Sequence, residues 1–293
     1  MDHIIEQMLK QYNTQTIIDK KNGIKEVVQE IILCGLSRAG FFKTAAFYGG
    51  TALRIFYGLD RFSEDLDFSS MSSDPFFDLS EYFPILEKEV HAYGLNFKVE
   101  AKEKTFESVI KSAFLKGNTK EHMLMFYADE QLTRSIGLNE LIKVKFELDT
   151  NPPEKAAFET RFRLLPMPYE VTLYDMPSLF AGKIHTVLCS AWKSRVKGRD
   201  LYDYVFFVAR QSTVNLVHLT ARLIQSGFLP NGTKVTLADL KAMLCKRFAE
   251  IDFTQAKQDF LPFIRNPGAL DVWSTEFFCQ ITDGLVIDEP FIY

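Results

Sequence analysis

The chain has 293 residues with a formal net charge of −4, and 47% of its residues are hydrophobic while 25% are charged. This composition is typical of a globular protein of one or two domains, and it excludes a chain coated with basic residues for wrapping nucleic acid. The four cysteines are far apart and form no CxxC pair, so we expect reduced thiols and neither a disulfide framework nor a zinc site.

The first half of the chain mixes helical and strand patterns. Apolar residues recur at helical spacing over 4–36, and we expect a break at Asn22-Gly23. AAFY at 45–48 predicts a short buried strand, and the TALRIFYG segment after the glycine pair predicts a short helix that ends at Gly58. Alternating or extended patterns predict further strands at 62–70, 96–104, 121–129 and 142–150, and extended structure over 156–174.

The second half of the chain is predominantly helical. Helices are favoured at 178–192, 201–211, 213–229, 237–251 and around Trp273. We therefore expect an α+β protein with an α/β domain over 1–170 and a mainly helical domain over 171–293. No run approaches the roughly 18 apolar residues of a membrane span, and the start lacks signal-peptide features, so we expect a cytoplasmic protein without membrane contact.

The segment FSEDLDFSS carries two carboxylates at strand spacing. Alternate strand residues share a face, so Leu66 and Phe68 should enter the core while Ser63, Asp65 and Asp67 line the other face. Carboxylates about 7 Å apart can converge on a pair of divalent cations, and oxygen ligands favour Mg²⁺. The alternative is a solvated strand edge, which is the usual role of an isolated Asp-x-Asp.

Gly49-Gly50 lies between the predicted strand and the predicted helix. The absence of side chains lets a phosphate approach the backbone, the helix start favours an anion, and Thr51 adds a hydroxyl. A glycine pair alone is more often a structural turn. Taken together with the two aspartates, the pattern favours a site that holds a nucleotide triphosphate at one end and its metal ions at the other.

At these residues the sequence resembles the AbiEii/AbiGii-type nucleotidyltransferase toxins, which belong to the superfamily related to DNA polymerase beta. The resemblance implies a mixed sheet with flanking helices before a helical half, and metal-dependent transfer of a nucleotide from NTP, often to tRNA. It also implies a cognate antitoxin. The matching residues of GGTALR and R-x-S-x-D-L-D are Gly49, Gly50, Thr51, Arg54, Arg61, Ser63, Asp65 and Asp67.

A second block, AGKIHTVLCSAWKSRVKGRDLYDYVF at 181–206, resembles the later motif of the same family. The resemblance implies that Lys183 and Arg195 neutralise charge as pyrophosphate leaves. Lys183 also has a plain alternative, a lysine at the edge of the core. Asp200 either orients a cation or caps the following helix, and Asp203 remains the alternative acid.

Glu147 is the candidate for a third carboxylate. It projects opposite to its apolar neighbours on the predicted strand, and the resemblance implies a general base on the attacking hydroxyl from such a strand. Asp149 shares its face, so the choice between the two stays open, and a solvent-exposed strand edge is the alternative for both.

The expected activity is nucleotide transfer to an RNA hydroxyl, on a tRNA 3′ end. Two alternatives remain: an enzyme acting on a small acceptor such as an antibiotic, and a catalytically inactive fold that binds proteins. A basic loop favours a polyanionic acceptor, and it consists of Lys193, Arg195, Lys197 and Arg199.

Overall fold

The computed structural model describes residues 2–12, 15–101, 119–128, 141–191, 196–264 and 267–288. The chain divides into two compact units. The first consists of residues 1–58, 62–152 and 158–173, and the second consists of 59–61, 153–157 and 174–293. The first sequence motif therefore contributes to both units, because Arg61 belongs to the second and Ser63 to the first.

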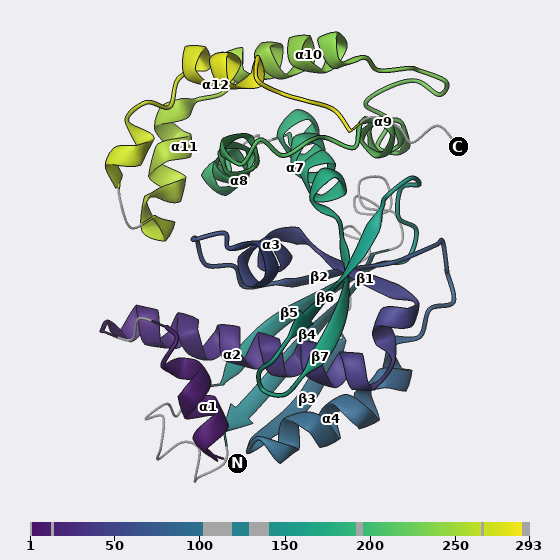
Figure 1. Cartoon of the computed structure of the whole chain (residues 1–293), viewed down its shortest axis with the longest axis vertical. Helices are drawn as coiled ribbons and strands as arrows, with labels where there is room; N and C mark the ends of the chain where they lie inside the picture. Colours follow the sequence, from purple (N-terminus) through teal and green to yellow (C-terminus); the bar gives the residue numbers. More distant parts are fainter. Residues whose placement is uncertain are drawn as a thin grey trace. The chain divides into compact units, whose positions relative to one another are not determined.

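The first unit contains the sheet and the helices of the first half of the chain (Figure 1). Its helices are α1 (Asp2–Leu9), α2 (Ile17–Arg38), α3 (Gly49–Tyr57) and α4 (Phe83–Ala92), with 3₁₀ turns at η1 (Phe41–Lys43) and η2 (Leu79–Tyr82). Its strands are β1 (Ala45–Tyr48), β2 (Leu66–Ser70), β3 (Leu95–Ala101), β4 (Thr119–Ala128), β5 (Ile142–Asp149), β6 (Phe158–Arg163) and β7 (Tyr169–Tyr174). The last residue of β7 begins the second unit's main segment.

The strands form one mixed sheet, with seven strands within the described residues in the order β3-β4-β5-β2-β1-β7-β6. β2 is central: it runs antiparallel to β1 and parallel to β5. Its burial alternates at the start, and Leu66 and Phe68 are fully buried as predicted. The Phe68 ring stacks on Phe146 of β5 at a centroid distance of 4.6 Å and meets Phe41 edge-on at 5.1 Å. An aromatic core therefore fixes the strand that carries Asp67.

The second unit is helical within the described residues. Its helices are α7 (Met176–Cys189), α8 (Gly198–Ala209), α9 (Leu216–Gln225), α10 (Leu237–Ala249), α11 (Phe253–Phe260) and α12 (Thr275–Thr282), with 3₁₀ turns at η3 (Leu261–Phe263) and η4 (Pro267–Leu270). Phe180 of α7 stacks on Phe207 of α8 at 4.6 Å, and the Tyr204 hydroxyl lies 2.6 Å from the Thr282 hydroxyl. None of the helices in the described ranges combines the length and hydropathy needed to cross a membrane.

The α+β fold class is confirmed, as are the strand at 45–48 and the short helix that follows it. Gly58 ends α3 in the left-handed conformation, and its N–H donates to the Leu53 carbonyl. The strands predicted over 96–104, 121–129 and 142–150 correspond to β3, β4 and β5; residues 102–104 and 129 lie outside the described residues.

The break predicted at Asn22-Gly23 is wrong, because α2 runs through both residues; among the described residues, 10–12, 15 and 16 are the non-helical ones that precede it. The physical reason is a close approach at the glycine. A Cβ on Gly23 would lie 3.1 Å from Cβ of Tyr12, so the end of the first helical segment packs where the side chain is missing. A packing role therefore accounts for this glycine.

Candidate active site

Gly49 and Asp67 are in close contact at the start of α3. Gly49 has φ +84°, in the left-handed region, and a Cβ built on it would lie 2.2 Å from Oδ2 of Asp67 and 2.9 Å from its Cγ. Tyr48, the residue before it, pairs with Asp67 in the antiparallel β1–β2 ladder. Glycine is therefore required at position 49 both by backbone conformation and by the carboxylate that occupies the space of a side chain.

The register between β2 and β5 places a second carboxylate beside Asp67. Asp67 pairs with Glu147, and Ser69 pairs with Asp149, in parallel strands. Glu147 is thus the acidic residue next to Asp67, and a Lys145 ion pair holds its carboxylate. Asp149 accepts a hydrogen bond from the Asn151 N–H at 3.0 Å, a contact typical of a turn. Of the two acids that the sequence left open, Glu147 is the one adjacent to Asp67.

Asp65 lies just before the strand. β2 begins at Leu66, so Asp65 is exposed in the connecting segment, while Asp67 is half-buried within the strand. Of the three residues predicted to share one strand face, only Asp67 lies within the strand, because Ser63 and Asp65 precede it. In the part of the chain that the structure describes, no group of three or more histidine, cysteine, aspartate or glutamate side chains is arranged to hold a metal ion.

Thr51 is fully buried, and its hydroxyl contacts the segment that leads into β2. It donates to the Asp65 carbonyl oxygen. The Thr51 oxygen also lies 2.9 Å from the Ser63 hydroxyl oxygen. Because the single hydroxyl proton of Thr51 is donated to the Asp65 carbonyl, which can only accept, the Ser63 hydroxyl must donate to Thr51. The structure thus engages the Thr51 hydroxyl inside the protein, where the sequence predicted a phosphate contact.

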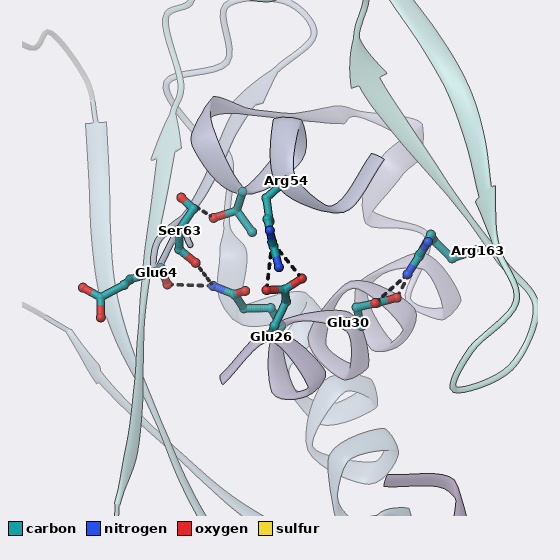
Figure 2. Close-up of polar contacts among 8 residues, drawn as sticks. Glu26, Glu30, Arg54, Ser63, Glu64 and Arg163 are labelled. Carbon is teal, nitrogen blue, oxygen red and sulfur yellow. Dashed lines mark hydrogen bonds and ion pairs between the residues drawn. The ribbon is translucent and has the colours of Figure 1, made fainter. Parts of the chain in front are cut away.

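Arg54, one of the residues that match the first family motif, is directed toward α2 (Figure 2). Its Nε donates to both carboxylate oxygens of Glu26 at 3.2 and 3.1 Å. Burial raises the pKa of Glu26, and the Arg54 guanidinium offsets part of that rise. This pair ties α3 to α2, so the described role of Arg54 is to hold the helix that begins at the glycine pair.

In the second unit, one buried carboxylate forms ion pairs with two cationic side chains. Asp203 is fully buried, accepts hydrogen bonds from Nε and Nη2 of Arg61 at 2.6 Å each, and lies 2.6 Å from Nζ of Lys183. Burial alone raises the pKa of Asp203, but Arg61 and Lys183 outweigh it and hold that pKa below its usual value. The lysine is therefore oriented by an ion pair.

Asp203 is the acid that orients Lys183, whereas the sequence favoured Asp200. Asp200 is the third residue of α8, which begins at Gly198, so the predicted cap is wrong and Lys197 occupies the cap position. The Oδ2 atom of Asp200 is buried and has no hydrogen-bond partner among the described residues. Burial raises the pKa of Asp200, and the Lys183 charge opposes that rise.

The basic loop is only partly visible in the structure. Lys193 and Arg195 lie outside the described residues. Lys197 is exposed at the start of α8. The Arg199 guanidinium lies over the Phe263 ring at 5.0 Å, so this cation packs against a neighbouring element.

Sequence reasoning missed the buried polar residues of α2, one of which, Gln29, bonds the segment that leads to Asp65. Glu26, Gln29 and Glu30 are buried in a helix whose other central residues are apolar. Their spacing of three and four residues places them on one helical face, and that signal was present in the sequence. A polar stripe inside an apolar helix predicts partners on other elements, because buried polar groups need hydrogen bonds.

Comparison with known proteins gives one family match. None of the curated proteins is similar enough in sequence to match the chain. Among solved structures, the chain is similar to MenT4, a nucleotidyltransferase toxin from Mycobacterium tuberculosis H37Rv, with 16% identity, 97% of each chain covered and a TM-score of 0.52. It is also similar to JHP933 from Helicobacter pylori, with 18% identity, 88% of this chain and 85% of that chain covered, and a TM-score of 0.44.

The family match covers most of the chain. The model described as "Nucleotidyl transferase AbiEii toxin, Type IV TA system" matches residues 31–276, a range that contains both sequence motifs. The chain therefore belongs to the AbiEii family of nucleotidyl transferase toxins, and nucleotidyl transfer is its activity.

Proposed function

We propose that this enzyme transfers a nucleotide from NTP to a hydroxyl of RNA, at a tRNA 3′ end, with the help of divalent metal. The hydroxyl oxygen attacks the α-phosphorus, a new phosphodiester bond forms, and the bond to the β-phosphate breaks to release pyrophosphate. Catalysis of this kind depends mainly on positioning and on electrostatic stabilisation. A cognate antitoxin is the proposed protein partner.

One observation carries this proposal: the Asp67 carboxylate lies against Gly49 at the start of α3 and beside Glu147 on the next strand. Carboxylate oxygens next to a turn whose first residue has no side chain support this proposal. Gly49 and Gly50 are the first two residues of α3, so the first backbone N–H groups of this helix lie at the turn. We assign the phosphates to that backbone and not to the Thr51 hydroxyl, which is already engaged.

The residues present fit a magnesium ion. Mg²⁺ prefers oxygen ligands and is usually bound through one or two carboxylates together with substrate phosphates, so it needs no complete cage of protein ligands. Asp65 and Asp67 would hold it, and when bound it would neutralise phosphate charge. Glu147 is the proposed general base, which would take the proton of the attacking hydroxyl.

Cations of the second motif are proposed to meet the triphosphate. Lys183 and Arg195 would neutralise the negative charge that develops on pyrophosphate as it leaves. Support for Lys183 is its ion pair with Asp203, because an oriented ammonium group keeps its charge and its direction. The proposal makes Asp203 a positioning residue for Lys183.

The test is labelling of total RNA with each of the four triphosphates, labelled at the α-phosphate, with wild type, Asp67→Asn and Asp149→Asn. We expect wild type and Asp149→Asn to label RNA with one preferred triphosphate and Asp67→Asn to label none while keeping its melting temperature. Asp149→Asn is matched because it removes a carboxylate two register pairs further along the same two strands. Full labelling by Asp67→Asn would contradict the metal assignment. Pyrophosphate release only with small acceptors would favour the antibiotic-type alternative.

A further inference from the structure

The segment that presents Asp65 is held by side chains at three successive carbonyls. Residues 62–65 are not part of any strand. Gln29 of α2 donates through Nε2 to the Ser63 carbonyl at 3.1 Å and to the Glu64 carbonyl at 2.8 Å, and Figure 2 shows these contacts. Thr51 of α3 donates to the Asp65 carbonyl. Two side chains thus supply the donors that a neighbouring strand would supply in a sheet.

Both donor side chains are fully buried, so they have little freedom to adopt other arrangements. Gln29 and Thr51 have no exposed surface. The Oε1 atom of Gln29 is buried without a hydrogen-bond partner among the described residues, while both protons of its amide nitrogen are directed to carbonyls. Removal of the Gln29 donor would take a hydrogen bond from the carbonyl of Ser63, a buried residue, and an unpaired polar group is costly in a protein interior. Removal of the Thr51 hydroxyl would take a donor from the Asp65 carbonyl.

The elements that carry these donors are fixed to each other. The Glu26–Arg54 ion pair joins α2 to α3 one turn before Gln29, as Figure 2 shows. At the exposed side of the same segment, Lys25 pairs with Glu64 at 2.7 Å. Side chains of α2 and α3 therefore bond the carbonyls of this segment, and the partly buried Glu26–Arg54 pair joins the two helices to each other.

We propose that Gln29 and Thr51 are positioning residues for Asp65: together they hold the backbone that presents this carboxylate to the metal. The inference rests on the proposed function, because it assigns a purpose to Asp65 in binding a divalent cation. Asp67 is fixed by the β2 ladder, whereas Asp65 lies before the strand, where Gln29 bonds the Glu64 carbonyl and Thr51 bonds the Asp65 carbonyl. Second-layer partners of metal ligands typically change metal affinity by about 10–100-fold when they are removed.

The test compares Gln29→Met, which keeps length but removes the donor, with Glu30→Gln as the matched control. Glu30 is the next residue of α2, is equally buried, and bonds Arg163 and Tyr169, away from residues 63–65. Mn²⁺ affinity is measured by electron paramagnetic resonance without substrate, and amide hydrogen exchange reports on residues 63–66. We expect Gln29→Met to weaken Mn²⁺ binding by at least about tenfold and to accelerate that exchange, while Glu30→Gln changes neither.

Thr51 provides a rescue pair. Thr51→Val removes the hydroxyl at constant shape and should reproduce the effect of Gln29→Met, whereas Thr51→Ser keeps the donor and should restore Mn²⁺ affinity. Wild-type affinity in both Gln29→Met and Thr51→Val, or an equal loss in Glu30→Gln, would overturn the inference. The Asp65→Asn variant, compared with wild type, separates the metal proposal from the inference that rests on it. Absence of any Mn²⁺ binding in wild type overturns the metal proposal and the inference with it. Binding by wild type that Asp65→Asn leaves unchanged overturns the inference alone.

Discussion

Gly49→Ala is the substitution whose cost the structure defines best. Two independent effects act at this position, because Gly49 has φ +84° and its missing Cβ lies where the Asp67 carboxylate is found. Gly58, at the other end of α3, has φ +74°, and beyond its chain neighbours no atom of the described residues lies within 4 Å of the place that a Cβ would take. Gly58→Ala therefore measures the backbone effect alone, within the same helix.

The expected loss of unfolding free energy is larger for Gly49→Ala than for Gly58→Ala, because only Gly49 combines the left-handed backbone with a close neighbour. An alanine in the left-handed region costs roughly 1–2 kcal/mol of unfolding free energy, and this is the whole effect expected of Gly58→Ala. At Gly49 the Cβ would be 2.2 Å from Oδ2 and 3.0 Å from Cβ of Asp67, so the strand residue must move. Overpacking of this kind costs about 1–3 kcal/mol more. Gly49→Ala should therefore lose about 2–5 kcal/mol.

The assay is urea denaturation of both variants, alone and combined with Asp67→Ala. Replacing Asp67 removes the two closest atoms, so Gly49→Ala should cost less in that background, while Gly58→Ala should cost the same in both. Equal losses for the two alanine variants, or a Gly49→Ala cost that Asp67→Ala leaves unchanged, would refute the contact between the glycine and the carboxylate. Nucleotide transfer should also be lost in Gly49→Ala and kept in Gly58→Ala.

Two further predictions concern the second unit. Asp203→Asn should lower the unfolding free energy by about 3–5 kcal/mol, because two cations lose their buried partner, whereas Lys183→Met should cost less and mainly reduce transfer; equal losses would contradict this division. Burial, reinforced by Arg222, lowers the pKa of His185 to about 3; burial also lowers the pKa of His218 to about 4. The contribution of each neutral, buried histidine to the free energy of unfolding is therefore fully present above pH 6.5. It should fall by roughly 1 kcal/mol per pH unit for each histidine from pH 6.5 toward 4. Denaturation of wild type and His218→Gln across this pH range measures the loss.

Local signals explain what the sequence predicted correctly. The strand at 45–48 is a short apolar run that meets a glycine pair, and Gly58 ends α3 because a left-handed residue suits a helix end. Alternation placed Leu66 and Phe68 in the core, since strand residues change face at every step. Each of these features depends on neighbours within a few residues, so it is visible in the sequence.

Contacts between distant residues explain what the sequence left open. Arg61 and Asp203 are 142 positions apart, and only the packed helices show that Asp203 and not Asp200 meets Lys183. Likewise the β2–β5 register pairs Glu147, and not Asp149, with Asp67, and no spacing within either strand contains that register.

Destabilising features of the first unit lie together around Asp67, and buried hydrogen bonds support the segment that leads to it. Asp67 and Glu147 are like charges in register on adjacent strands, an arrangement that destabilises a sheet, and Gly49 adds a left-handed residue beside them. On the inner side, Gln29 and Thr51 are fully buried and bonded to the segment that precedes Asp67. Local rules that are broken at one point and compensated nearby are expected where function constrains the sequence. A divalent cation held by Asp65 and Asp67 would offset the repulsion between Asp67 and Glu147, so metal binding should stabilise this unit against unfolding.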